Sequence, residues 1–175
     1  PALFLPRQNI RMQLDKLIKD FNILQWDRIV ISDGSGTTGK PCGWGVVVVD
    51  EKRKVELLHG SLSLGTNNDA EILGVVQGLR HCYLTKPANK PFLACHVFSD
   101  STHATQPALW KKHRDLRALI TFYAQEGLQI ALHHIPRNSF PMAELVHYTA
   151  NGARKAAITV LEDDPLAERR KNADC

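Results

Sequence analysis

Hydrophobic and polar positions change their spacing several times along the chain, and each change predicts an element. Apolar side chains recur at helical spacing over residues 8–22, which predicts an amphipathic helix. A strand over residues 28–32 follows and stops at Asp33, where glycines interrupt it. Two further apolar runs, at residues 43–50 and 54–63, flank the charged segment DEKRK, as antiparallel strands do. Three strands therefore precede the first core helix.

The middle of the chain contains the next helix and strand. The helix begins near Asn68, in a segment rich in capping residues, and ends near Pro87. Its apolar positions recur at intervals of three and four residues, which predicts one face buried against a sheet: Ile72, Val75, Val76 and Leu79. A strand over residues 92–99 follows and ends at Asp100.

One more helix–strand pair and a last helix complete the pattern. Apolar positions at helical spacing predict a helix that ends before Gly127, and residues 128–135 form the next strand. The last helix begins at either Ala143 or Thr149 and ends at Leu161. A charged tail that contains a proline follows it.

This order of elements predicts an α/β fold with a five-stranded mixed sheet flanked by helices. Among the first three strands, each is antiparallel to the next along the chain. The last two strands run parallel to the first and are connected through crossover helices. We divide the chain into an N-terminal helical extension (1–26), a folded domain (27–161) and a charged tail (162–175). The extension either caps the core of the domain or is the remnant of a connection to a preceding domain.

Composition narrows the class of protein. A chain of 175 residues, 43% of them hydrophobic, suffices for one domain with a buried core. No apolar run approaches the roughly 18 residues of a membrane-spanning helix, and no signal-peptide pattern is present. The four cysteines lack metal-binding spacing, which predicts free thiols in a reducing intracellular compartment, cytoplasmic or nuclear. The net charge of +4 is compatible with a nucleic-acid partner but does not require one.

Three acidic residues lie where α/β sheets place their ligands. Asp33 and Asp100 each end an apolar strand, and these two strands are expected to be neighbours. Glu71 borders the apolar stripe of the helix that begins near Asn68. Three carboxylates at one edge repel one another unless cations neutralise them, and hard oxygen ligands select Mg²⁺, with Mn²⁺ as a substitute. Two such ions can activate a water and stabilise the leaving oxygen in phosphodiester hydrolysis.

The segments that contain these acids, VISDGSG, TNNDAE and VFSDS, resemble in order and spacing the first three active-site segments of the type I, or retroviral-like, ribonuclease H family. The resemblance covers about residues 27–160. It implies a metal-dependent endoribonuclease that hydrolyses the RNA strand of RNA·DNA hybrids and leaves a 3′-hydroxyl and a 5′-phosphate. Asp33, Glu71 and Asp100 would be the catalytic metal ligands. The chain begins without Met, as expected of a processed or trimmed protein or of a piece cut from a longer polyprotein. The resemblance leaves two alternatives open, a free-standing enzyme and part of a larger reverse-transcriptase-like polyprotein.

The same resemblance implies residues that contact the hybrid. Gly34, Asn67 and Asn68 match positions that hold the nucleic-acid backbone and probe the ribose 2′-hydroxyl, although helix capping by one of the two asparagines is an alternative. Thr102 and Arg137 are the remaining nucleic-acid-binding candidates.

Aromatic and basic residues outside these segments have two interpretations each. Six residues that would share one helix form either a backbone-binding ridge or a solvated face: Trp110, Lys111, Lys112, His113, Arg114 and Arg117. Trp44, between two glycines, is expected to pack on the sheet and not to stack on bases.

The fourth segment departs from the family pattern. The family usually carries an acid where this chain reads YTANGARKAAIT. If the alignment with the family pattern includes a one-residue deletion, Asn151 takes the place of the acid and offers an amide oxygen as a catalytic metal ligand. If the alignment has no gap, Ala150 stands at that position. We prefer Asn151, for which N-capping of the last helix is the other interpretation.

A mobile histidine that the family often places after the last strand also lacks a clean match. Arg137 or Asn138 falls nearby, and His134 and His147 are substitutes. The missing acid motivates an alternative function, a catalytically degenerate ribonuclease H-like domain that binds nucleic acid or a protein partner. Another nuclease of the same fold, such as a resolvase or a transposase core, would not need the TNN segment.

Overall fold

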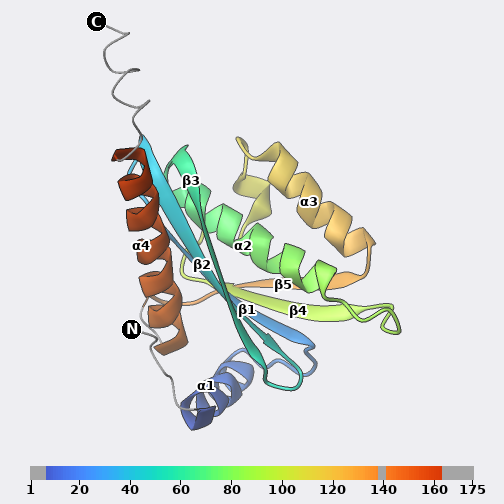
Figure 1. Ribbon diagram of the computed structural model, residues 1–175. Coiled ribbons are helices and arrows are strands. Elements are labelled where there is room, and N and C mark those ends of the chain that lie inside the picture. The colour runs from blue at the N-terminus through green and yellow to red at the C-terminus, as the bar shows by residue number, and fades with distance from the viewer. Residues whose placement is uncertain (1–6, 138–140, 163–175) are drawn as a thin grey trace, which may run out of the picture.

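The computed structural model describes residues 7–137 and 141–162, and a five-stranded mixed sheet forms its centre (Figure 1). The strand order is β3-β2-β1-β4-β5. Its strands are β1 (Arg28–Ser35), β2 (Lys40–Asp50), β3 (Val55–Gly65), β4 (Leu93–Ser99) and β5 (Leu128–His134). β2 runs antiparallel to both of its neighbours, β1 and β3, and β4 runs parallel to both β1 and β5. The predicted α/β fold is therefore confirmed.

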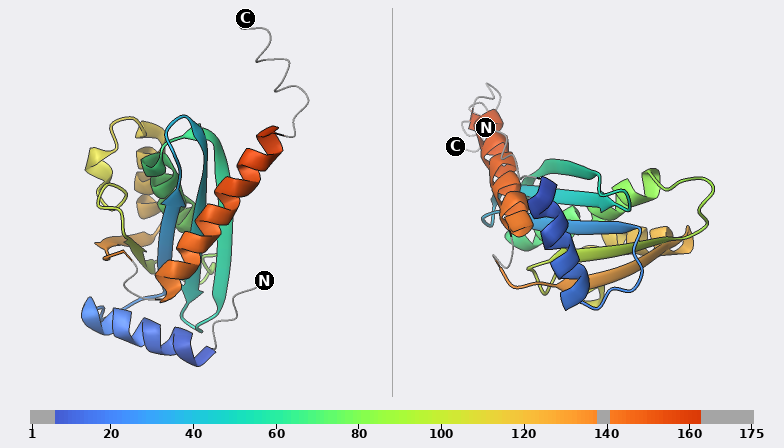
Figure 2. Two further views of the ribbon diagram at one scale, coloured as in Figure 1. Left: turned by 90° about the vertical axis from the view of Figure 1, so that its left-hand side faces the viewer. Right: turned by 90° about the horizontal axis from the view of Figure 1, so that it is seen from below.

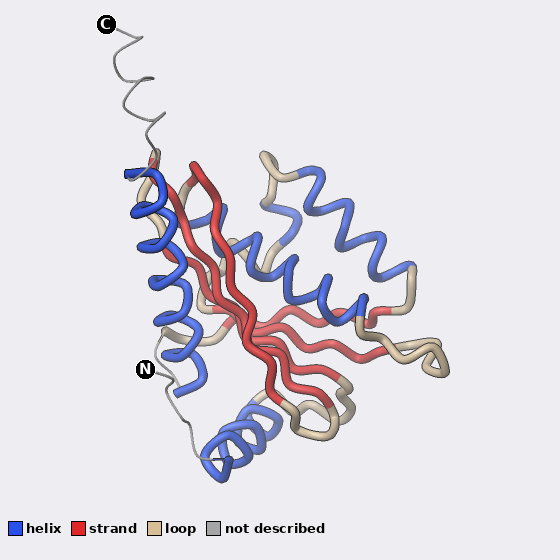
Figure 3. Tube along the Cα trace, viewed as in Figure 1, coloured by secondary structure: helices blue, strands red, loops and turns tan. Residues whose placement is uncertain are grey.

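Helices cover both faces of this sheet, which forms a single twisted layer (Figure 3). α2 (Asn67–Leu84) and α3 (Arg114–Gln125) pack on one face, and α1 (Arg7–Asp20) and α4 (Pro141–Glu162) lie on the other (Figure 2). Alternate residues of β1 enter the two hydrophobic clusters: Val30 faces α2, whereas Ile29 and Ile31 face α1 and α4. Both faces of the central strand are buried, as the apolar run RIVIS requires.

The start of α2 is defined by a capping box. Thr66 is the N-cap, its hydroxyl accepts a hydrogen bond from the backbone N of Asp69 (3.2 Å), and the Asp69 carboxylate accepts one from the backbone N of Thr66 (2.7 Å). The helix begins at Asn67, one residue before the predicted start. Neither asparagine of TNNDAE is the cap, so both side chains are free for other contacts.

Two sequence predictions about helices are wrong. Trp110 is not on a helix with Arg117, because a short 3₁₀ turn (Pro107–Leu109) precedes it and α3 begins only at Arg114. The indole of Trp110 is fully buried and donates a hydrogen bond to the carbonyl of His103 (2.8 Å), which excludes it from any surface ridge. The last helix begins at Pro141, so Asn151 lies inside α4 and is not its N-cap.

Other predictions hold with adjusted bounds. β1 continues through Asp33 to Ser35, because β2 still pairs with it after its parallel pairing with β4 ends at Ser32. Trp44 packs on the sheet as expected, since a Cβ at Gly60 of β3 would lie 2.5 Å from its ring.

The N-terminal helix contributes to the core. Leu14 and Leu17 of α1 are buried in the same cluster as Phe98 and Val146, although the domain boundary at residue 26 stays a prediction. Within the described part of the chain, no helix has the length and apolar character to cross a membrane.

Candidate active site

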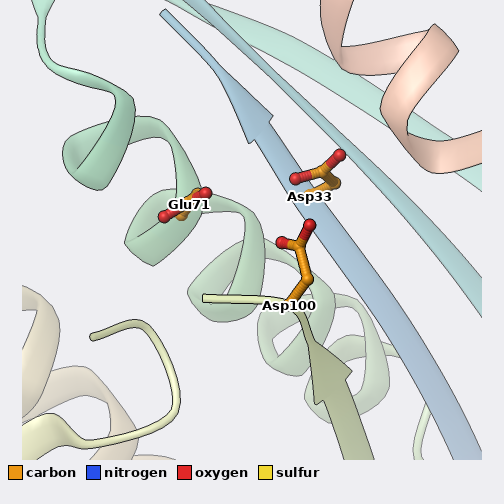
Figure 4. A group of neighbouring side chains, drawn as sticks. All are labelled: Asp33, Glu71 and Asp100. Atoms are coloured by element: carbon orange, nitrogen blue, oxygen red, sulfur yellow. The ribbon is translucent and has the colours of Figure 1, made fainter. Parts of the chain in front are cut away.

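Three carboxylates converge at the carboxyl ends of the two central parallel strands (Figure 4). Asp33 lies one residue beyond the last β1–β4 pair, Ser32 with Ser99, and Asp100 follows β4 directly. Glu71 reaches the same point from the first turns of α2. One ligand oxygen from each acid lies within 4.8 Å of the others. The structure thus brings together the three acids that the sequence analysis selected.

A close approach of helix and strand places Glu71 there. A Cβ at Gly34 would lie 2.5 Å from the backbone N of Glu71, so only glycine lets α2 pack this tightly on β1. Asn67 holds the carboxylate in position, since its Nδ2 donates to Oε1 of Glu71 (2.9 Å). The Oδ1 of Asn67 in turn accepts a hydrogen bond from the backbone N of Gly36 (3.1 Å), which links α2 to the end of β1.

Burial and mutual repulsion alter the protonation of these acids. Burial, followed by the neighbouring charge of Asp100, raises the pKa of Asp33 to about 6, although hydrogen bonds from His147 and the backbone N of Gly34 oppose the increase. Burial also raises the pKa of Glu71, against a hydrogen bond with Ser101, and the charges of Asp100 and Asp33 add to the increase. Without a counter-charge, the ionised cluster is electrostatically unfavourable.

The donor set fits a hard divalent cation. Carboxylate oxygens are the preferred ligands of Mg²⁺ and Mn²⁺, and a cation among them would offset the burial and the repulsion that raise the pKa values of Asp33 and Glu71. The described residues contain no other group of three or more His, Cys, Asp or Glu side chains with metal-ligand geometry.

The remaining nucleic-acid candidates lie around this cluster. Asn67 and Asn68 are exposed at the start of α2, and Thr102 is exposed just after Asp100. Arg137 is also exposed and lines the small cavity beside Asp33 and Asp100. Gly34 is buried beneath α2, which favours a packing role for it. Asn138 lies outside the described residues.

At the fourth position, the two candidate residues face different surroundings. Ala150 is fully buried against β2, where a Cβ at Gly43 would lie 2.2 Å from its carbonyl oxygen. Asn151 is half-buried, and its Nδ2 lies 3.2 Å from Nε2 of His147. Asn151 is therefore one side chain removed from Asp33, which His147 contacts directly through Nδ1 (2.7 Å).

Sequence reasoning missed part of this arrangement. Ser35 and Arg154 were not singled out, yet the Ser35 hydroxyl donates to Oδ1 of Asn151 (2.5 Å) and accepts from Nε of Arg154 (3.0 Å). His147 was named only as a substitute for the mobile histidine. Its spacing of four residues from Asn151 on one helix was the available signal. His134, the other substitute, contacts only the backbone carbonyl of Asp100 (3.1 Å) among the neighbouring site residues.

Comparison with known proteins supports the fold. No protein-family model matches the sequence, and no curated protein matches it significantly. Among solved structures, the N-terminal RNase H domain of a Mycobacterium tuberculosis protein has a TM-score of 0.64 and 22% identity, over 78% of this chain and 99% of that one. An RNase H1 isolated from compost by a metagenomic approach, LC11, solved in complex with an RNA/DNA hybrid, has a TM-score of 0.58 and 22% identity, over 73% and 99%.

A viral structure extends this comparison to a multidomain protein. The foamy viral protease-reverse transcriptase in complex with an RNA/DNA hybrid has a TM-score of 0.60 and 14% identity, over 88% of this chain and 21% of that one. At these identities the likeness shows the fold alone, a ribonuclease H-like sheet flanked by helices.

Proposed function

We propose that the chain is a member of the type I ribonuclease H family, a metal-dependent endoribonuclease that hydrolyses the RNA strand of RNA·DNA hybrids and leaves a 3′-hydroxyl and a 5′-phosphate. The observation that carries the proposal is the convergence of Asp33, Glu71 and Asp100 within 4.8 Å, at the carboxyl ends of β1 and β4 of a ribonuclease H-like fold. Two of the similar solved structures contain an RNA/DNA hybrid, which makes this substrate the first to test.

In this proposal the three carboxylates hold two Mg²⁺ ions, for which Mn²⁺ substitutes, and the fourth segment completes the site, either through Asn151 itself, as the sequence predicts, or through the histidine that Asn151 contacts. Ions bound there supply water activation and charge stabilisation for phosphodiester hydrolysis. Hydrogen bonds within the chain hold these carboxylates in position. Asn67 orients Glu71, and the backbone N of Gly34 donates to Oδ1 of Asp33 (2.9 Å).

Exposed polar residues around the acids would bind the hybrid. Asn67, Asn68, Thr102 and Arg137 surround the cluster and supply donors for phosphate and ribose oxygens, and Gly34 lies beneath them. The likeness to a domain within a viral reverse transcriptase supports the further proposal that the chain works within, or is released from, a larger polyprotein. Three buried free cysteines, Cys42, Cys82 and Cys95, favour a reducing intracellular compartment.

The fourth position favours a second candidate, a domain that binds nucleic acid or a protein partner without cleavage. Neither Ala150 nor Asn151 carries the charge that a fourth acid would supply to the metal site. Metal-dependent cleavage distinguishes the two candidates.

The test is cleavage of an end-labelled RNA·DNA hybrid beside RNA·RNA and DNA·DNA duplexes, with Mg²⁺, Mn²⁺ or EDTA. We expect metal-dependent cutting of the RNA strand of the hybrid alone. Asp33→Asn and Asp100→Asn should each abolish cutting while circular dichroism shows an unchanged fold. A folded wild-type chain that binds the hybrid but cuts under neither metal would support the binding domain instead, and full activity in either variant would rule out the proposed site.

A further inference from the structure

A chain of hydrogen-bonded side chains reaches Asp33 from α4. Arg154 donates through Nε to the hydroxyl of Ser35 (3.0 Å), and Ser35 donates to Oδ1 of Asn151 (2.5 Å). The Nδ2 of Asn151 lies 3.2 Å from Nε2 of His147, whose Nδ1 lies 2.7 Å from Oδ2 of Asp33. The network ends on one of the proposed metal ligands.

One neutral tautomer of His147 satisfies both of its contacts. A side-chain NH₂ group only donates, so Nε2 of His147 accepts from Asn151 and Nδ1 carries the proton. That proton is donated to the carboxylate of Asp33. In this tautomer a proton occupies the lone pair of Nδ1 that would otherwise be available to a cation.

The space beside these atoms is small, and its lining combines polar side chains with apolar ones from β1 and α4. His147, Asp33 and Asp100 line one cavity of about 10 Å³, together with Arg137. This is roughly the room that one water-sized occupant needs. The Nδ1 of His147 thus places a nitrogen atom directly beside Oδ2 of Asp33, at the edge of the cluster of three carboxylates.

We propose that His147 is a ligand of the divalent cation that Asp33 holds, and that Asn151 orients His147 without contacting the cation. The inference rests on the metal-dependent activity proposed above and names the side chain that takes the place of the missing acid. Imidazole is the commonest metal ligand in proteins, and a ligating histidine almost always donates its other N–H to a neighbouring acceptor. Asn151 is that neighbour.

The network accommodates both states of the imidazole. When Nδ1 is a ligand, the proton moves to Nε2, which needs an acceptor. A rotation of the Asn151 amide by 180° offers Oδ1 to Nε2–H and turns Nδ2 toward Ser35, whose hydroxyl oxygen accepts as well as donates. The hydroxyl hydrogen of Ser35 then loses Oδ1 of Asn151 as its acceptor, so the exchange of a proton for a cation costs the network one hydrogen bond and leaves its other contacts in place.

A nitrogen ligand also changes the metal preference. Mg²⁺ strongly prefers oxygen ligands, whereas imidazole suits transition metals, so replacing a family carboxylate by His147 should favour Mn²⁺ over Mg²⁺. The expected preference for Mn²⁺ over Mg²⁺ therefore comes from His147, and it can be measured by metal binding in the absence of substrate.

The experiment is calorimetric titration of the full chain with Mn²⁺ and with Mg²⁺, in the absence of nucleic acid. His147→Ala should weaken Mn²⁺ binding about tenfold or more, which is the scale of losing a metal-site contact. His147→Asp should restore binding and lower the ratio of Mn²⁺ to Mg²⁺ affinity. His59→Gln is the matched control: it removes an exposed imidazole on β3, away from the carboxylates, and it should change Mn²⁺ affinity by less than twofold.

A spectroscopic test reports ligation directly. Nitrogen-15 spectra of the imidazoles, with the His147 signals identified by their loss in His147→Ala, should show the proton on Nδ1 without metal. Saturation with diamagnetic Cd²⁺ should move the proton to Nε2 and shift the Nδ1 signal to that of a ligand. An unchanged tautomer with Cd²⁺ bound would overturn the inference.

The outcomes separate this inference from the proposed function. If wild-type chain binds no Mn²⁺, or binds it equally well after Asp33→Asn, the metal-dependent function fails. If binding requires Asp33 but His147→Ala leaves it unchanged, only the role of His147 fails. If Asn151→Ala weakens Mn²⁺ binding more than His147→Ala does, Asn151 is the ligand and the inference is overturned.

Discussion

Asp33 links the stability of the chain to its proposed chemistry. It is 6% exposed, has a raised pKa, and lies beside two other acids. A carboxyl whose folded pKa lies above its unfolded value stabilises the fold fully below the unfolded pKa and loses that contribution as the pH rises through the folded pKa. For Asp33 the loss therefore falls between about pH 4 and pH 6, with ionised Asp33 unfavourable above it.

Asp33→Asn should consequently stabilise the metal-free chain at pH 8. The difference between about 6 and 3.8 corresponds to at most about 3 kcal/mol, so an increase of roughly 1–3 kcal/mol in the free energy of unfolding is expected. The difference should shrink at pH 4, where the native carboxyl is protonated. Urea unfolding with EDTA at both pH values measures it, and Asp20→Asn, at an exposed position, is the control. Added Mg²⁺ should stabilise the wild type and not the variant, whereas a destabilised Asp33→Asn at pH 8 would contradict the repulsion argument.

At the scale of single elements, the first turn of α2 determines where Asn67 and Glu71 point. The capping box satisfies backbone donors that a helix start leaves without partners. Thr66→Ala removes the hydroxyl that accepts a hydrogen bond from the backbone N of Asp69, and it should lower the free energy of unfolding by about 1 kcal/mol. Amide hydrogen exchange in residues 67–71 should speed up at the same time. Thr66→Ser retains the hydroxyl and should retain both properties; equal losses in the two variants would mean that the cap is not the cause.

The packing of α4 on β2 positions His147 and Asn151 at the site. A Cβ at Gly43 would lie 2.3 Å from the backbone N of Arg154, with no flexible side chain to yield. Gly43→Ala should therefore displace α4, cost about 1–3 kcal/mol of stability and weaken Mn²⁺ binding. Gly152→Ala is the matched control on the same helix, because nothing lies within 4 Å of its Cβ position and alanine favours the helix by roughly 0.5–1 kcal/mol. Urea unfolding and calorimetry of both variants test this, and a neutral Gly43→Ala would contradict it.

Across the whole molecule, local patterns predicted most of the fold. Apolar spacing defined the strands and helices because each element buries one or two faces. The ends of the apolar runs located Asp33 and Asp100, although β1 itself continues to Ser35. The sequence did not predict the break before α3, because the buried indole of Trp110 and its bond to His103 are tertiary contacts. The network from Arg154 to Asp33 was equally inaccessible, since it joins residues more than 110 positions apart through the packing of α4 on β2.

The role of the N-terminal helix is a property of the whole molecule, and its packing argues that it belongs to the core. Leu14 of α1 is fully buried in one cluster with residues of β1, β2, β4 and α4, so its removal would expose apolar surface under the sheet. Leu14→Ala should lower the free energy of unfolding by about 2–5 kcal/mol, the usual cost of a truncated core leucine. Met12→Ala, on the same helix at a side chain that is 70% exposed, should change it by less than about 0.5 kcal/mol. If both variants unfold like the wild type in urea, α1 is an appendage and the boundary at residue 26 stands. If Leu14→Ala alone is destabilised, the folded domain begins with α1, and the central strands that carry Asp33 and Asp100 depend on it.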